Sequence, residues 1–106
     1  MSFRDAQQAV DRWIGQFEEG YFPPLANVAR LTEEVGELAR EINHRFGPKP
    51  KKPSEPDGSI AMELADILFV VICLANSQAI DLDDAFAQMM VKVTSRDAGR
   101  WTRKAR

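Results

Sequence analysis

The sequence is poor in the residues that cross-link small secreted proteins. Its 106 residues include a single cysteine, Cys73, and a single histidine, His44. One cysteine cannot form an intrachain disulfide, which fits a reducing compartment. Cys73 lies in the apolar stretch ILFVVICLA, residues 67–75, which favours a small buried side chain over a reactive thiol. We therefore expect a cytoplasmic protein.

The sequence also lacks a long apolar run, a signal sequence and a large charge of one sign. The stretch at 67–75 has nine residues, about half of the ~20 that span a bilayer. The N-terminal segment MSFRDAQQAVDRW is too charged for a signal peptide. The net charge is −2, although the last eleven residues, RDAGRWTRKAR, are locally basic. This composition does not favour membrane insertion or nucleic-acid binding.

Apolar residues recur at helical spacing through most of the chain, and no strand pattern, internal repeat or glycine-rich phosphate loop occurs. The segment GPKPKKPSEPDG, residues 47–58, has four prolines and predicts a loop. Ser59 and Asp81 are expected to cap the helices that follow it. The sequence predicts one domain, residues 1–106, an all-α bundle of four helices at about 4–19, 25–46, 59–80 and 82–98.

The third predicted helix differs from the others because residues 67–75 are apolar on every face. A helix on the surface of a monomeric bundle normally shows a polar side. A chain of 106 residues has little interior in which to surround a whole helix. We expect a second subunit to cover it, so the bundle should be completed in a homodimer or homotetramer.

Four glutamates fall within nine residues of the second predicted helix, at Glu33, Glu34, Glu37 and Glu41. At about 100° per residue, Glu34, Glu37 and Glu41 share one flank and Glu33 faces away. A solvated helix face is one explanation, because nearby arginines can offset the repulsion. On this helix alone, that explanation and a functional one are equally supported.

Two acids in the third helix favour the functional explanation. Glu63 and Asp66 are three residues apart, hence on one face, in sequence that otherwise belongs in a core. Burying them without partners would cost several kcal/mol each. If the second and third helices pack antiparallel, Glu34 and Glu37 lie at a similar depth. The sequence predicts a cluster of carboxylate ligands for Mg²⁺, with Mn²⁺ as a possible substitute.

A different metal site is also conceivable. The residues EINH, Glu41 to His44, form a Glu-x-x-His unit, which di-iron bundles use in two copies. Since His44 is the single histidine, a partner chain would have to supply the second copy. We favour a place for His44 at the helix end or at the edge of the magnesium site.

Basic residues that could bind a phosphate substrate occur in two places. Lys92, Arg96 and Arg100 are spaced by four and predict a basic stripe on the fourth helix. The same residues would also suit a helix C-terminus without any ligand. The second place is the loop, where Lys52 and its neighbours could close on phosphates.

The sequence resembles the MazG-type nucleotide pyrophosphohydrolases of the all-α NTP pyrophosphatase superfamily, in particular the short single-domain subgroup. The resemblance rests on EEVGE (33–37) followed by ELAD (63–66), and on PLANVARLTEEVGELAREINHRFG, LADILFVVICLANS and IDL. It implies an all-α dimer or dimer of dimers that hydrolyses a nucleoside triphosphate to the monophosphate and pyrophosphate with Mg²⁺.

By motif position, the resemblance implies metal ligands at Glu34, Glu37, Glu63 and Asp66. Glu33 would be an accessory acid, and Glu34 or Glu37 would accept the proton of the attacking water. Lys92 and Arg96 match the family's C-terminal basic positions loosely. The expected role is housekeeping of the cell's nucleotide pool.

Two other functions fit the same residues: a phosphoribosyl-ATP pyrophosphohydrolase-like enzyme, and a non-catalytic helical module that binds metal or nucleotide. The base preference is not encoded in any recognisable motif. Trp13 could stack on a base, although its position on an apolar stripe favours the core.

Overall fold

The structure is a computed structural model, which describes residues 1–48, 51–54 and 58–105. Over these residues the chain is all-helical, without strands. This confirms the predicted all-α class. The four helices are α1 (Phe3–Ile14), α2 (Pro24–Phe46), α3 (Ile60–Ser77) and α4 (Leu82–Arg96). The predicted loop at 47–58 lies partly outside the described residues.

Three of the helices begin at side-chain caps. Ser2 and Asp5 form a reciprocal capping box at α1. The Ser59 hydroxyl accepts a hydrogen bond from the Met62 N–H, 3.1 Å away, at the start of α3. The Asp81 carboxylate accepts from two backbone N–H groups at the start of α4. The predicted caps at Ser59 and Asp81 are therefore confirmed.

Three helices end earlier than the sequence pattern predicts. α1 ends at Ile14 instead of residue 19. Gly15 is its C-cap, and the Phe17 N–H donates to the Ile14 carbonyl in the turn that follows. α3 ends at Ser77 instead of residue 80, and Ala79 in the following connection has a φ of 55°. α4 ends at Arg96 instead of residue 98. Apolar periodicity continued through these turns, so it did not reveal them.

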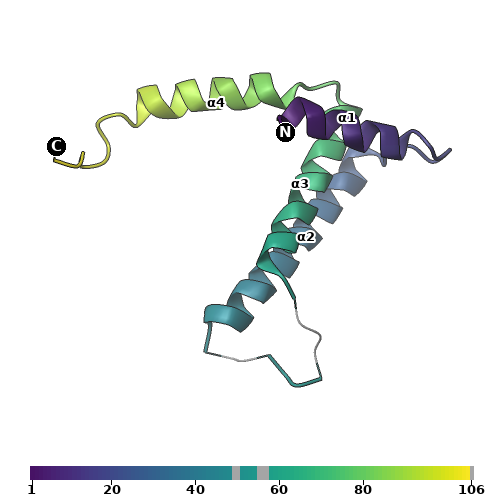
Figure 1. Cartoon of the computed structure of the whole chain (residues 1–106), viewed down its shortest axis with the longest axis horizontal. Helices are drawn as coiled ribbons and strands as arrows, with labels where there is room; N and C mark the ends of the chain where they lie inside the picture. Colours follow the sequence, from purple (N-terminus) through teal and green to yellow (C-terminus); the bar gives the residue numbers. More distant parts are fainter. Residues whose placement is uncertain (49–50, 55–57, 106) are drawn as a thin grey trace.

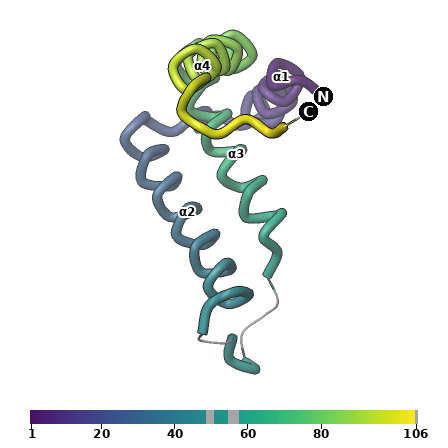
Figure 2. Tube along the Cα trace, turned by 90° about the vertical axis from the view of Figure 1, so that its left-hand side faces the viewer, coloured from purple at the N-terminus to yellow at the C-terminus, as the bar shows by residue number. Residues whose placement is uncertain are grey.

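α2 and α3 pack side by side as an antiparallel hairpin, and α1 crosses the end of α3 that lies away from the 47–58 loop (Figures 1 and 2). Among the described residues, the buried apolar ones all belong to α3, namely Val70, Ile72, Cys73 and Ala75. Burial raises the pKa of the Cys73 thiol. The expectation that Cys73 is a small buried side chain is confirmed.

α4 extends away from the hairpin and packs on α1 (Figure 1). The chain is consequently open, with a radius of gyration of 17.8 Å, against about 13 Å for a compact domain of this length. By length and composition, α3 would also suffice to cross a membrane, with a mean hydropathy of 1.9 over 18 residues. Its two acids and its packing against α2 favour the core of a helical assembly.

Candidate metal centre

Three carboxylates from two helices converge between α2 and α3. Glu34 lies on α2, and Glu63 and Asp66 lie one turn apart on α3. One oxygen from each lies within 4.8 Å of the other two, and all three side chains are half-buried. We call this group the acid cluster. The antiparallel packing of α2 on α3 therefore brings together three of the four predicted metal ligands.

The electrostatics of the acid cluster are those of crowded like charges. Burial raises the pKa of the Glu63 carboxyl, and the negative charges of Asp66, Glu37, Glu34 and Glu41 raise it further. The charges that act most strongly on Glu63 are thus all acidic. A cation placed among these oxygens would offset both the cost of burying the charged groups and the repulsion between them.

The donor set fits a hard divalent cation. Every group in the acid cluster is a carboxylate, and neither sulfur nor imidazole belongs to it. Mg²⁺ and Mn²⁺ favour such oxygen ligands, and Mg²⁺ commonly completes its shell with water and substrate phosphate. The three side chains are half-buried, so part of their surface is accessible to such ligands.

The other acids of α2 lie around the acid cluster in different ways. Glu37 is exposed, and although its charge acts on Glu63, its oxygens are not among the converged three. Glu33 is exposed as well, as expected for a side chain that faces away. Glu41 is half-buried and lies 3.9 Å from the Lys51 ammonium in an ion pair.

The predicted phosphate-binding residues on α4 lie on a helix that leads away from the acid cluster of the same chain. Lys92 and Arg96 are exposed on α4, which points away from the hairpin (Figure 1). Arg96 forms an ion pair with Asp97 at 3.2 Å. Arg100 lies beyond the end of α4, over the Trp101 ring, so the helical stripe holds two of its three predicted members. Lys52 is exposed in the loop.

The positions of His44 and Trp13 do not assign either residue a role in the site. His44 lies in the last turn of α2 and lines a hollow with Glu41, Arg45 and Lys51. It is not part of the acid cluster, and the described residues contain no histidine-bearing metal group. Trp13 is 54% exposed and contacts Phe17 edge-on.

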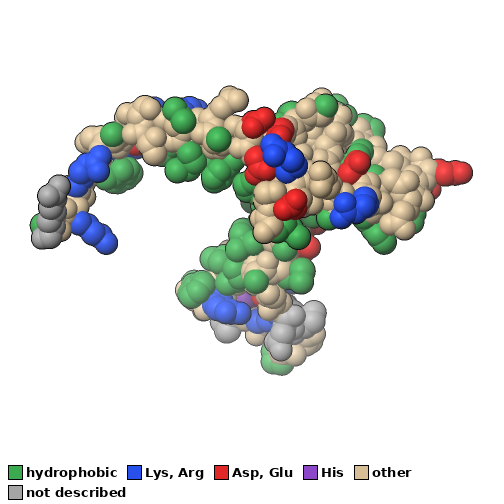
Figure 3. All heavy atoms as spheres, turned by 45° about the horizontal axis from the view of Figure 1, so that its top comes forward, with side chains coloured by type: hydrophobic (Ala, Val, Ile, Leu, Met, Phe, Trp, Pro, Cys, Tyr) green, Lys and Arg blue, Asp and Glu red, His purple; other side chains and the backbone are tan. Residues whose placement is uncertain are grey.

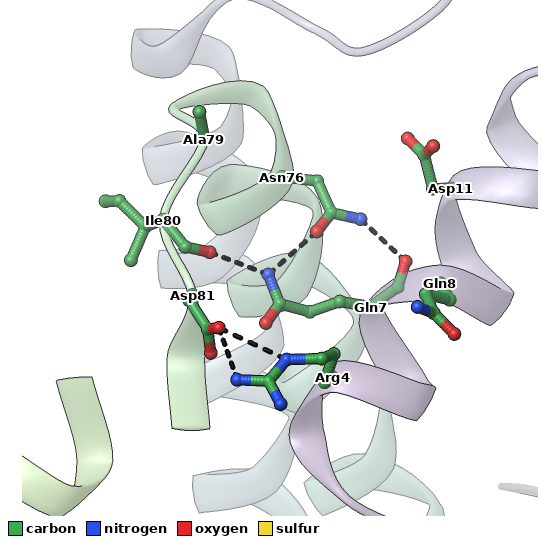
Figure 4. Close-up of a pocket in the computed structure, with 8 residues that line it drawn as sticks. All are labelled: Arg4, Gln7, Gln8, Asp11, Asn76, Ala79, Ile80 and Asp81. Atoms are coloured by element: carbon green, nitrogen blue, oxygen red, sulfur yellow. Dashed lines mark hydrogen bonds and ion pairs between the residues drawn. The ribbon is translucent and has the colours of Figure 1, made fainter. Parts of the chain in front are cut away.

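A polar network at the junction of α1, α3 and α4 was not predicted. Asn76 donates hydrogen bonds to the Gln7 carbonyl and the Tyr21 hydroxyl, at 3.0 and 2.9 Å, and accepts one from the Gln7 amide. Tyr21 in turn donates to Asp11 at 2.6 Å. Figure 4 shows the Gln7–Asn76 contacts beside a hollow of about 360 Å³. Isolated Gln, Asn and Tyr residues far apart in sequence give no pattern that predicts this network.

Comparisons with known proteins find similar sequences and structures. Residues 22–101 match the model of the MazG nucleotide pyrophosphohydrolase domain. The chain is 59% identical over 103 residues to the uncharacterized protein YpjD of Bacillus subtilis (strain 168), a match that covers 97% of this chain and 93% of YpjD.

Two crystal structures have a similar fold. That of YpjD from Bacillus subtilis has 59% identity and a TM-score of 0.78, over 87% of this chain and 94% of that one. That of the Bacillus-conserved MazG protein, a nucleotide pyrophosphohydrolase, has 52% identity and a TM-score of 0.78, over 92% and 94%. The chain therefore belongs to the MazG nucleotide pyrophosphohydrolase family.

Proposed function

We propose that this chain hydrolyses a nucleoside triphosphate, ribo or deoxy, to the monophosphate and pyrophosphate with Mg²⁺ as cofactor. The observation that carries the proposal is the convergence of Glu34, Glu63 and Asp66 within 4.8 Å across two helices. Bringing three carboxylates together in a half-buried site is unfavourable because their charges repel. A cation that also binds the substrate phosphates would offset this repulsion and explain the cluster.

In this proposal, Glu34, Glu63 and Asp66 hold the cation, and Glu37 approaches from the next turn of α2. The bound cation would polarise phosphate oxygens and lower the pKa of a nearby water. Glu37 is exposed and outside the converged set, which supports it as the group that accepts the proton of that water. Glu34 is the alternative, and Glu33 would orient a ligand, a basic side chain or water.

Positive charge must meet the triphosphate, because the acid cluster and the phosphates have the same sign. Lys92, Arg96 and Lys52 are the proposed phosphate contacts, and Trp13, which is 54% exposed, is the proposed stacking surface for the base. The active form is proposed to be a homodimer or homotetramer in the cytoplasm, where it would act in housekeeping of nucleotide pools.

The test is pyrophosphate release from each NTP and dNTP with and without Mg²⁺. Asp66→Asn and Glu37→Gln should lower kcat/KM at least about 100-fold, because even the outer partners of metal ligands contribute 10- to 100-fold. Glu19→Gln, which removes an exposed charge outside the helices, is the matched control and should retain full activity. Normal release from folded Asp66→Asn would refute the site assignment.

The same substrate panel separates the alternative functions. Pyrophosphate release from phosphoribosyl-ATP, without release from any NTP, would indicate a phosphoribosyl-ATP pyrophosphohydrolase of histidine synthesis. Thermal stabilisation by Mg²⁺ and nucleotide without any turnover would indicate a binding module.

A further inference from the structure

We propose that Glu41 is a positioning residue of the acid cluster: it fixes the start of α3 against α2 and so sets the place of Glu63. The inference rests on the proposed function and adds to it a residue that is not itself a metal ligand. It starts from the setting of the Glu41 side chain, which is 15% exposed, although most residues of α2 are exposed.

Glu41 is held in this setting by the segment between α2 and α3. The Lys51 ammonium lies 3.9 Å from its carboxylate, and the Lys51 side chain is 22% exposed. Both residues line one hollow of about 250 Å³, together with His44 and Arg45. Figure 3 shows basic side chains gathered at this end of the hairpin. The pairing with Lys51 offsets the cost of placing the Glu41 carboxylate there.

Gly58 provides the space that the same carboxylate occupies. A β-carbon built at residue 58 would collide with both oxygens and the carboxyl carbon of Glu41. Glycine allows the backbone to approach another group this closely. Gly58 directly precedes Ser59, the residue that caps α3. Glu41 of α2 therefore contacts the chain at the point where α3 begins.

The start of α3 in turn holds Glu63. The Ser59 hydroxyl accepts the Met62 N–H, and the Ser59 carbonyl accepts the Glu63 N–H at 3.0 Å. Glu63 thus lies one helical turn beyond the cap that follows Gly58. The charge of Glu41 acts on Glu63 and contributes to the rise of its pKa. Because the two charges repel, a contribution to position explains this acid better than a contribution to stability.

Glu41 also shares a flank of α2 with Glu34. Seven residues make about two turns, so the two side chains point within about 20° of each other, about 10 Å apart along the axis. One helix thus carries a metal ligand and also the contact that places a ligand of the facing helix. Mg²⁺ requires near-ideal ligand geometry, and precise ligand positions depend on such supporting contacts.

A double-mutant cycle between Gly58→Ala and Glu41→Ala tests the proposal, with Mn²⁺ alone as the probe and its free concentration measured by electron paramagnetic resonance. Gly58→Ala keeps every charge but displaces the Glu41 carboxylate. We expect its Kd for Mn²⁺ to rise about 10-fold, the lower end of the effect of losing an outer partner of a metal ligand. Glu41→Ala should weaken binding to a similar extent.

The double variant should bind Mn²⁺ as weakly as either single variant, because both substitutions remove the same contact. Gly99→Ala is the matched control, since a β-carbon built there meets no atom within 4 Å, and it should bind like the wild type. Unchanged binding by Gly58→Ala, or single effects that multiply in the double variant, would overturn the proposal.

Hydrogen exchange in EDTA separates positioning from charge. The amides of Met62 and Glu63 should exchange faster in Glu41→Ala and in Gly58→Ala than in the wild type, because the start of α3 has lost its contact with α2. If Glu41 acted through its charge alone, Glu41→Ala would relieve the repulsion at Glu63 and slow this exchange. Equal or slower exchange in Glu41→Ala therefore contradicts the proposal.

Failure of the proposed function can be told apart from failure of this inference. If the wild type binds no Mn²⁺ and releases no pyrophosphate, the proposed function is wrong, and the exchange rates in EDTA still decide whether Glu41 fixes the start of α3. If the wild type binds Mn²⁺ and the variants bind it equally well, this inference alone is wrong.

Discussion

At the scale of single residues, the acid cluster holds carboxylates where their charge is unfavourable. Glu63 is the clearest case, since burial and four neighbouring acids raise its pKa. Because a carboxyl with a raised pKa binds its proton more tightly in the folded state, folding loses stability as the pH rises above the ordinary glutamate value of 4.5. We therefore expect the acid cluster to reduce the stability of the chain above this pH unless a cation is bound.

This predicts opposite effects of Glu63→Gln with and without metal. At pH 7 without divalent cations, the variant should melt at a higher temperature than the wild type, because one repelled charge is gone. With excess Mg²⁺ the wild type should gain stability and the variant should gain little. Melting curves at pH 5 and 7, each with EDTA or Mg²⁺, measure both effects. A wild type that is more stable than Glu63→Gln in EDTA at pH 7 would contradict the account.

Tyr21 gives a second prediction at this scale, since the chain has one tyrosine. Burial and the hydrogen bond to Asp11 raise the pKa of Tyr21 to about 12. In the unfolded chain the phenol ionises near 10, so stability should fall as the pH rises from 10 towards 12. Absorbance at 295 nm should therefore show tyrosinate only well above pH 10, and Tyr21→Phe should remove this part of the pH dependence. Titration near pH 10 in the folded protein would contradict it.

At the scale of helices, the sequence predicted the features that depend on residues close together in the chain. The all-α class, the caps at Ser59 and Asp81 and the meeting of Glu34 with Glu63 and Asp66 followed from periodicity, capping residues and axial depth. The direction of α4 did not follow, because it is set by contacts between residues about 80 positions apart, such as Arg4 with Asp81. For the same reason the sequence could suggest Lys92 and Arg96 as phosphate contacts without placing them beside the acids.

The network at Asn76 predicts a stability effect at this scale. Asn76→Ala would remove the amide that joins α1 to α3 and leave the half-buried Gln7 side chain with one partner fewer. The free energy of unfolding should fall by about 1–3 kcal/mol, the cost of leaving a buried polar group unsatisfied. Urea denaturation measures it, with Gln8→Ala, an exposed neighbour on α1, as the control. Equal stability of the two variants would mean that the network does not hold α1 in place.

At the scale of the whole molecule, one chain is too open to enclose its own apolar surface. Val35 and Ile42 on α2 and Leu68 on α3 are 49%, 38% and 48% exposed. Val35 and Ile42 are two turns apart on α2 and so share one exposed apolar face, which another copy of the chain could cover. A homo-oligomer explains this openness and the apolar composition of α3 together.

Val35→Glu tests that explanation, because a charge on the exposed apolar surface of α2 should oppose association. The wild type should sediment as a dimer or tetramer, and the variant should shift towards a monomer. Gln8→Glu adds the same charge to α1 and should not change the sedimentation. A monomeric wild type at micromolar concentration would contradict the expected assembly.

The central claim is that the acid cluster supports Mg²⁺-dependent cleavage of a nucleoside triphosphate into monophosphate and pyrophosphate. Product identification by ³¹P NMR tests it most directly, with wild type and Asp66→Asn compared in Mg²⁺ and in EDTA. The account predicts pyrophosphate and monophosphate from the wild type with Mg²⁺, and at most about 1% of that rate from Asp66→Asn or in EDTA. Release of orthophosphate and diphosphate instead, or equal pyrophosphate release from Asp66→Asn, would contradict it.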